Sequence, residues 1–256
     1  MAKILCIANQ KGGVGKTTTA INLAASIAAA ERRTLLIDCD AQGNASTGLG
    51  VSREAIREQN LYQALIGKRP LREVIVGTMI PQLDIVPADQ DLIGIEVEFV
   101  PLPDREKKLR TLVRALETPY EFIILDCPPS LGFMTLNALV AADALIIPLQ
   151  CEYFAMEGLG HLLNTLRLVK ARLNPSLQLG GILLTMFDTR NLLSHRVSED
   201  VRRHFGSKVF QTCIPRNVRL SESPSHGLPI LLYDIRSRGA LSYMDLAKEI
   251  LANGRR

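Results

Sequence analysis

Lys11-Gly-Gly-Val-Gly-Lys-Thr-Thr18 is a glycine-rich loop between an apolar run, Ile4–Ala8, and a helical pattern that starts near Lys16. A loop that follows a strand and opens a helix has the context that phosphate binding requires. Its glycines let backbone N–H groups turn inward, and the helix adds its positive N-terminal end. The stretch therefore predicts a site for nucleotide phosphates, bound by Lys11, Gly12, Gly13, Val14, Gly15, Lys16, Thr17 and Thr18.

Two side chains of this loop carry the expected chemistry. Lys16 can reach the β- and γ-phosphates, and the Thr17 hydroxyl can ligate Mg²⁺. The common G-x-x-x-x-G-K-[ST] pattern would place Gly at position 10, where this chain has Gln10, and the departure brings a second lysine, Lys11. A glycine-rich turn with unrelated lysines is the alternative, and the order of strand, loop and helix disfavours it.

Short apolar runs alternate with longer helical patterns along the chain. The runs are continuous, which is typical of strands buried on both faces of a parallel sheet. This alternation predicts one α/β domain over residues 1–256, a doubly wound, mostly parallel sheet with helices on both faces. We expect strands at 4–8, 34–37, 83–86, 122–125, 144–148 and 181–185, and helices after Lys16 and at 105–116, 136–142, 157–173, 195–204 and 240–252. Gly50–Ile80 is the least regular stretch, and we expect a surface excursion with short helices there.

The composition is that of a globular protein, with 256 residues, 47% hydrophobic and 22% charged. Five scattered cysteines without a C-x-x-C pair indicate a reducing cytoplasm rather than disulfides or a metal. No apolar run predicts a signal peptide or a membrane-spanning helix. The net charge is +4, yet residues 182–256 carry +5 and residues 1–181 carry −1. This asymmetry indicates either a local anionic partner or a solvated basic surface.

Carboxylates follow two of the apolar runs. Asp126 ends the run at 122–125, where an acid fits a Mg²⁺ site, usually through water, although a turn before proline would also explain it. Asp38 and Asp40 flank Cys39 after the second run, and a plain carboxylate at a strand end or in a loop would explain Asp38 equally well. Ligands of open α/β sheets bind outside the carboxyl ends of the strands, and an acid near the γ-phosphate can orient or deprotonate the attacking water.

Four segments together resemble the ParA/MinD family of deviant Walker A ATPases, most of all its chromosomal ParA (Soj) branch. They are Lys11–Thr18, Asp38-Cys-Asp-Ala-Gln-Gly-Asn44, Leu125-Asp-Cys-Pro-Pro-Ser130 and Ile214–Gly227. The resemblance implies a nucleotide-sandwich homodimer with ATP, in which Lys11 crosses to the partner's nucleotide. It also implies that Asp40 is catalytic with Lys11 and Lys16, and that Asp38 supports the lysines and the switch loop. The family often has proline where this chain has Ala41.

The resemblance extends to the C-terminal third of the chain. It implies that Pro215 and Asn217 border the adenine, although turn and N-cap chemistry alone would explain both residues. It also implies that Arg190 and Arg219 contact DNA in the ATP dimer. Few aromatic residues accompany the basic ones, which favours contacts to the phosphate backbone over base stacking. Three further arginines fit a solvated helix face equally well: Arg196, Arg202 and Arg203.

The resemblance implies a Mg²⁺-dependent ATPase that partitions chromosome or plasmid DNA and is stimulated by a ParB-type centromere-binding protein. We expect it in the cytoplasm, on the nucleoid and without a stable membrane anchor. One alternative is a MinD-like division-site ATPase on the membrane, for which Ala247–Arg256 is a poor amphipathic anchor. A second is an iron–sulfur reductase that uses Cys127 or Cys151. A third is a DNA-binding regulator, whose extra N-terminal domain has no room before Lys11.

Overall fold

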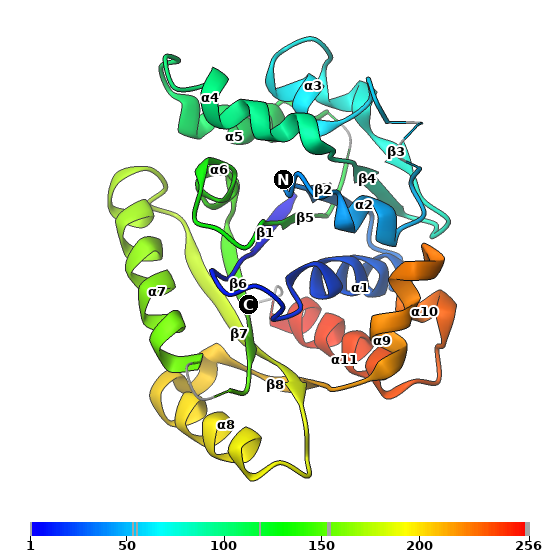
Figure 1. Cartoon of the computed structure of the whole chain (residues 1–256), viewed down its shortest axis with the longest axis vertical. Helices are drawn as coiled ribbons and strands as arrows, with labels where there is room; N and C mark the ends of the chain where they lie inside the picture. The colour runs from blue at the N-terminus through cyan, green and yellow to red at the C-terminus, as the bar shows by residue number, and fades with distance from the viewer. Residues whose placement is uncertain (1, 53, 55, 118, 153–154, 254–256) are drawn as a thin grey trace.

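The computed structural model describes residues 2–52, 54, 56–117, 119–152 and 155–253 (Figure 1). The described strands form one eight-stranded sheet in the order β3-β4-β2-β5-β1-β6-β7-β8. Neighbouring strands pair in parallel except β3 and β4, which are antiparallel. The strands are β1 Lys3–Ile7, β2 Thr34–Asp38, β3 Val76–Gly77, β4 Leu83–Val86, β5 Phe122–Asp126, β6 Ala144–Gln150, β7 Gln178–Phe187 and β8 Val209–Pro215.

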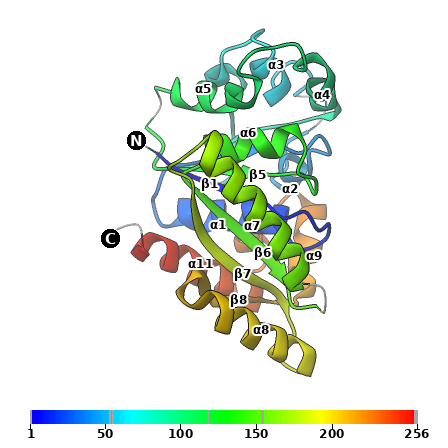
Figure 2. The same ribbon diagram turned by 90° about the vertical axis from the view of Figure 1, so that its left-hand side faces the viewer.

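Helices cover both faces of this sheet. Figure 2 shows α7 and α8 in front of the strands, with α1 and α11 behind them. The α-helices are α1 Lys16–Ala29, α2 Asn44–Gly48, α3 Leu61–Leu65, α4 Ile95–Glu98, α5 Lys108–Arg114, α6 Phe133–Ala141, α7 Ala155–Arg172, α8 Leu192–Phe205, α9 Val218–Glu222, α10 Ile230–Tyr233 and α11 Arg238–Asn253. The 3-10 helices are η1 Leu71–Val74, η2 Gln90–Gly94, η3 Arg105–Lys107, η4 Gly206–Lys208 and η5 Ser223–His226.

Each central strand contributes to two cores because successive side chains point to opposite faces. In β1, Ile4 and Cys6 pack with α5, α6, α7 and α8, whereas Leu5 and Ile7 pack with α1 and α11. All four side chains are at most 5% exposed. The continuous apolar runs therefore are strands buried on both faces, and the doubly wound α/β fold predicted from them is confirmed.

Besides short helices that were not expected, such as α2, α4, α9 and α10, the structure differs from the predicted elements at the edges of the sheet and in Gly50–Ile80. β3 and β8 lie at the two edges of the sheet, and neither was predicted as a strand. β8 reads Val-Phe-Gln-Thr-Cys-Ile-Pro, and its polar centre is half-exposed or exposed, so the apolar run is interrupted. The described part of Gly50–Ile80 does contain short helices, but it is no mere surface excursion. Its Leu61, Leu65 and Val74 are buried in the same core as α5 and α6.

Candidate nucleotide site

The glycine-rich loop between β1 and α1 surrounds open space. Gly13 and Gly15 have φ angles of 73° and 85°, a left-handed conformation that side chains disfavour. A Cβ placed on Gly12, Gly13 or Gly15 would meet no described atom within 4 Å. Among the described residues, no side chain caps α1, and its first turn holds no acid. The N–H groups of that turn can therefore bind an anion.

Lys16 lies within this loop. Its side chain is only 7% exposed, and its Nζ donates a hydrogen bond to the Lys11 carbonyl oxygen at 3.0 Å. Burial lowers the pKa of Lys16, while the charges of Asp126 and Asp40 raise it. The structure thus brings the loop lysine together with two of the three acids that the sequence singled out.

Lys11 is placed differently. Its Nζ forms an ion pair with Glu152, which follows β6, and its side chain is 44% exposed. The Lys16 ammonium group therefore lies within its own loop, whereas the Lys11 ammonium group lies at the protein surface. Glu152 had no signal in the sequence, because only the folded chain brings the end of β6 next to the loop.

Two more side chains that sequence reasoning missed fix the loop from the neighbouring strands. Asn9 accepts a hydrogen bond from the Lys11 N–H at 3.0 Å and donates one to the Pro148 carbonyl at 2.7 Å. Thr185 of β7 donates to the Val14 carbonyl at 2.9 Å. An Asn directly after a strand is a detectable signal, whereas nothing in the sequence near Thr185 points to a loop 171 positions away.

Asp126, the last residue of β5, is fully buried, and neither carboxylate oxygen has a hydrogen-bond partner among the described residues. Burial and then the charge of Asp38 raise its pKa well above the usual range, while Thr17 and Lys16 lower it. A buried, unpartnered carboxylate is costly unless a cation or a donor reaches it. Mg²⁺ keeps several waters and takes few protein oxygens, so Asp126 and Thr17 fit such an ion beside the loop.

Asp38 organises the chain that follows β2. Its Oδ2 accepts hydrogen bonds from the Ser46 N–H at 2.9 Å and the Ser46 hydroxyl at 2.7 Å. Its Oδ1 accepts from the Asp40 N–H at 3.2 Å. Burial raises the pKa of Asp38 to about 6 against these hydrogen bonds. Asp38 therefore supports the loop, as the resemblance implies, but within the described chain it forms no ion pair with either lysine.

Asp40 lies at the mouth of the site. It is 9% exposed, and one carboxylate oxygen accepts a hydrogen bond from the Gln42 N–H at 3.0 Å. Asp38 and Asp126 are register partners in neighbouring strands, so the loop after β2 and the end of β5 meet. An acid held by one backbone donor keeps lone pairs for a further partner such as a water molecule.

Pro215 and Asn217 lie at the end of the sheet formed by the carboxyl ends of the strands. Pro215 ends β8, and Asn217 is the N-cap of α9, with its side-chain oxygen accepting from the Leu220 N–H at 3.3 Å. The N-cap explanation therefore applies to Asn217. It uses only the carbonyl oxygen and leaves the amide N–H groups without a hydrogen bond within the described chain.

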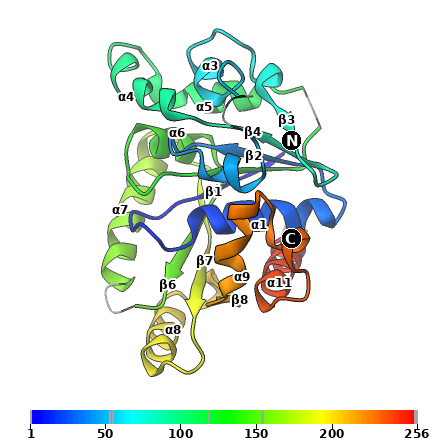
Figure 3. The same ribbon diagram turned by 45° about the vertical axis from the view of Figure 1, so that its right-hand side comes forward.

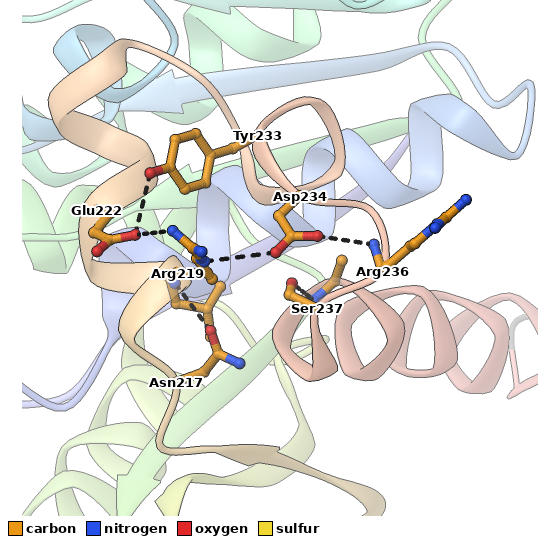
Figure 4. Close-up of polar contacts among 9 residues, drawn as sticks. Asn217, Arg219, Glu222, Tyr233, Asp234, Arg236 and Ser237 are labelled. Atoms are coloured by element: carbon orange, nitrogen blue, oxygen red, sulfur yellow. Dashed lines mark hydrogen bonds and ion pairs between the residues drawn. The ribbon is translucent and has the colours of Figure 1, made fainter.

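The two arginines expected at DNA lie after neighbouring strands, and both are paired with acids. Arg190, two residues beyond Asp188, donates two side-chain hydrogen bonds to it at 3.2 Å. Arg219 donates to Glu222 at 2.9 Å and lies 3.6 Å from Asp234 (Figure 4). Tyr233 also donates to Glu222, at 3.1 Å. The Arg190 side chain is 88% exposed and that of Arg219 is 54% exposed, so both can be reached from solvent.

The three weaker arginine candidates on α8 do not behave alike. Arg202 turns back to β8, where its guanidinium contacts the Gln211 carbonyl and the Cys213 sulfur. Arg203 pairs with Asp200 at 3.2 Å, and Arg196 is exposed. Only Arg196 and Arg203 thus belong to a solvated helix face.

The cysteines named for the iron–sulfur alternative are buried. Cys127 is 1% exposed with its sulfur 3.4 Å from that of Cys6, and Cys151 is 5% exposed. A cluster shared between subunits needs ligands at the surface, so this geometry disfavours the reductase.

Comparison with known proteins agrees with this geometry. The AAA domain family matches residues 2–179. The chromosome partitioning protein ParA of Myxococcus xanthus is 56% identical over 251 residues, which cover 98% of this chain and 88% of that protein. The sporulation initiation inhibitor protein Soj of Bacillus subtilis is 53% identical and covers 99% and 100%.

A solved structure resembles the whole chain. Cobyrinic acid a,c-diamide synthase from Mycobacterium smegmatis, with bound ADP and magnesium, superimposes with a TM-score of 0.88 at 34% identity. The match covers 100% of this chain and 96% of the other. The resemblance expected from the four sequence segments is confirmed, and the protein is an ATPase. The chain belongs to the ParA/Soj family of chromosome-partitioning P-loop ATPases.

Proposed function

We propose that residues 1–256 act as one ATPase domain that closes with ATP and Mg²⁺ into a nucleotide-sandwich homodimer. The dimer binds nucleoid DNA without sequence preference, and a ParB-type protein stimulates hydrolysis and so releases it. The observation that carries this proposal is the divergent placement of the two loop lysines. Lys16 lies inside its own loop, whereas Lys11 lies at the surface, where a second protomer's nucleotide can meet it.

The residues of the site then divide the work. Lys16 and the loop N–H groups bind the phosphates, and Lys11 adds positive charge from the partner, as an arginine finger does. Thr17 and Asp126, the latter through water, would hold Mg²⁺, which supplies further neutralisation of phosphate charge when bound. Asp40 orients the attacking water or accepts its proton.

The adenine lies at the C-terminal end of β8 in this proposal. The main chain at Pro215 and the amide of Asn217 border the base. The N-cap bond of Asn217 supports this role, because it fixes the side chain while its amide N–H groups keep their capacity to donate.

DNA binding follows from the position of Arg190 and Arg219. Both side chains are exposed and follow β7 and β8, so they lie at the same end of the sheet. Their present partners, Asp188, Glu222 and Asp234, are partly exposed acids at the surface, and surface ion pairs are weak, so DNA phosphates can replace them. Two contacts per protomer become four in a dimer, and affinity rises steeply with the number of phosphate contacts. ATP-driven dimerisation is therefore a switch for DNA binding.

The membrane alternative is disfavoured by the packing of α11. Its apolar side chains Ala240, Tyr243, Leu246 and Ile250 are buried. The helix packs against α1 and β8, and Figure 3 shows α11 below α1. A membrane-binding helix would need that face free. Residues 254–256 of the proposed anchor segment lie outside the described residues. No described helix is long and apolar enough to cross a bilayer.

Light scattering of the purified chain tests the dimer. We expect a monomer without nucleotide and with ADP, and a dimer with ATP. Lys11→Ala should bind ATP but remain monomeric, whereas Lys16→Ala should lose nucleotide. A Lys11→Ala chain that dimerises with ATP as readily as the parent would contradict the proposal.

A further inference from the structure

An apolar stripe is left open on the segment formed by η2 and α4. Ile93 of η2, Val97 of α4 and Val100, two residues beyond the end of α4, are 58%, 75% and 61% exposed. The other face of the same segment, with Leu92, Ile95 and Phe99, is buried. Monomeric proteins rarely expose a contiguous apolar stripe without a binding role.

The stripe lies in the most acidic part of the chain. Asp89–Asp104 holds five acidic residues and no basic residue, although the whole chain carries +4. Asp91, Glu96 and Glu98 are exposed around the stripe. Arg105 reaches the end of this segment, where its guanidinium donates to the Val100 carbonyl at 3.0 Å, but the five acids outnumber it and disfavour DNA and anionic lipid. This acidic charge attracts a segment that carries both apolar and basic side chains.

A cleft of about 590 Å³ begins at η2, where Gln90 and Asp91 line it close in sequence to the stripe. Among the described residues, the acids Glu58, Asp89 and Asp91 line it together with Arg57, and Glu58 also pairs with Arg69 at 3.4 Å. Ala41 and Gln42, the residues that directly follow Asp40, also line it. A lysine or arginine side chain that enters this cleft therefore lies next to the loop that carries the acid proposed to act on water.

Hydrogen bonds connect this region to two loops of the nucleotide site. Ser46 donates to Asp38 and accepts from the Ala88 N–H at 3.1 Å, which links the chain before η2 to the loop after β2. Glu96 accepts from the N–H of Phe133, the first residue of α6, at 3.1 Å. The loop that precedes α6 begins at Asp126, the last residue of β5. A ligand bound on α4 can thus change the conformation of the loop after β2 and of the loop before α6 at the same time.

We propose that the stripe of Ile93, Val97 and Val100, together with the acidic cleft, binds a basic segment with apolar anchors from the protein that stimulates hydrolysis. This inference rests on the proposed function and names the docking site of its partner. The anchors cover the stripe, and a lysine or arginine occupies the cleft beside Ala41 and Gln42.

The stripe lies far from the arginines proposed to bind DNA. Five strand spacings lie between β4, which precedes the stripe, and β7, which precedes Arg190, or about 24 Å at about 4.8 Å each. In all three views α4 and α8 lie at opposite ends of the molecule (Figures 1–3). One protomer can therefore hold DNA and the stimulating partner at the same time.

ATP hydrolysis measured with and without the full-length ParB-type protein from the same genome, in the presence of duplex DNA, tests this assignment. Ile93→Ser and Val97→Ser should keep the basal rate but lose stimulation about tenfold, as expected for central apolar contacts. Ile235→Ser is the matched control, because Ile235 has the same 58% exposure outside the stripe. Asp91→Asn should weaken stimulation, whereas Asp245→Asn on α11 should not.

Three outcomes are distinct. Selective loss in the stripe and cleft variants supports the docking site. Full stimulation of Ile93→Ser and Val97→Ser overturns it while leaving the partition function intact. A parent chain that the ParB-type protein does not stimulate overturns the proposed function and this inference together.

Discussion

At the level of single residues, the two loop lysines are expected to perform different tasks. Lys16→Ala removes the only described ammonium group that donates into the loop backbone, at the Lys11 carbonyl. Loss of one such preorganised charge should lower the hydrolysis rate by at least about 100-fold, measured as phosphate release. Lys11→Ala should lower the rate as strongly while nucleotide affinity of the monomer changes only a few-fold. Equal loss of nucleotide binding in both variants would refute this division.

A second residue-scale prediction concerns Ser46, whose hydroxyl joins Asp38 to the Ala88 N–H. Ser46→Ala leaves a buried carboxylate oxygen and a buried N–H each short of one partner, so we expect a loss of about 1–3 kcal/mol in unfolding free energy. Thermal unfolding without nucleotide measures it. Thr47→Ala is the control, because the Thr47 hydroxyl bonds only to the Gly43 carbonyl of its own helix. If Ser46→Ala and Thr47→Ala lost similar amounts of unfolding free energy, the Ser46 bridge would contribute no more than a local hydroxyl bond, which would contradict this prediction.

At the scale of elements, periodicity predicted the buried strands and the long helices because each repeats one apolar pattern. The edge strand β8 escaped prediction because half of its residues face solvent or a polar layer. Because the strands that precede them could be predicted, the loop glycines, Asp38, Asp40 and Asp126 could be found from their positions directly after strands. Glu152 and Thr185 could not, since their roles depend on strands that meet the loop only in the folded chain.

Replacing either of two glycines by alanine should change the unfolding free energy, in opposite directions at the two positions. Gly227 has a φ of 63°, and a Cβ there would lie 2.8 Å from the Gly50 Cα, so Gly227→Ala should destabilise the fold by more than about 1 kcal/mol. Gly160 lies within α7, and a Cβ there would meet no described atom within 4 Å. Gly160→Ala should therefore stabilise by about 0.5–1 kcal/mol. Chemical denaturation measures both, and destabilisation of equal size in the two variants would contradict the packing described.

At the scale of the whole molecule, DNA binding should depend on salt in proportion to the phosphates contacted. In a dimer each arginine occurs twice, so Arg190→Ala or Arg219→Ala should reduce the slope of log affinity against log salt by about 1.8. Arg202→Ala should leave the slope unchanged, because Arg202 contacts β8 instead of solvent. Fluorescence anisotropy over a salt series measures the slopes. A change for Arg202→Ala as large as that for Arg219→Ala would place the DNA surface on α8 instead.

The central claim is that ATP controls DNA binding through dimerisation. Its most direct test is the affinity of the purified chain for a non-specific duplex with ATP, with ADP and without nucleotide, at two salt concentrations. We expect binding only with ATP, weakened at the higher salt and weakened further by Arg219→Ala. Equal affinity with ADP and ATP at the same salt would contradict it.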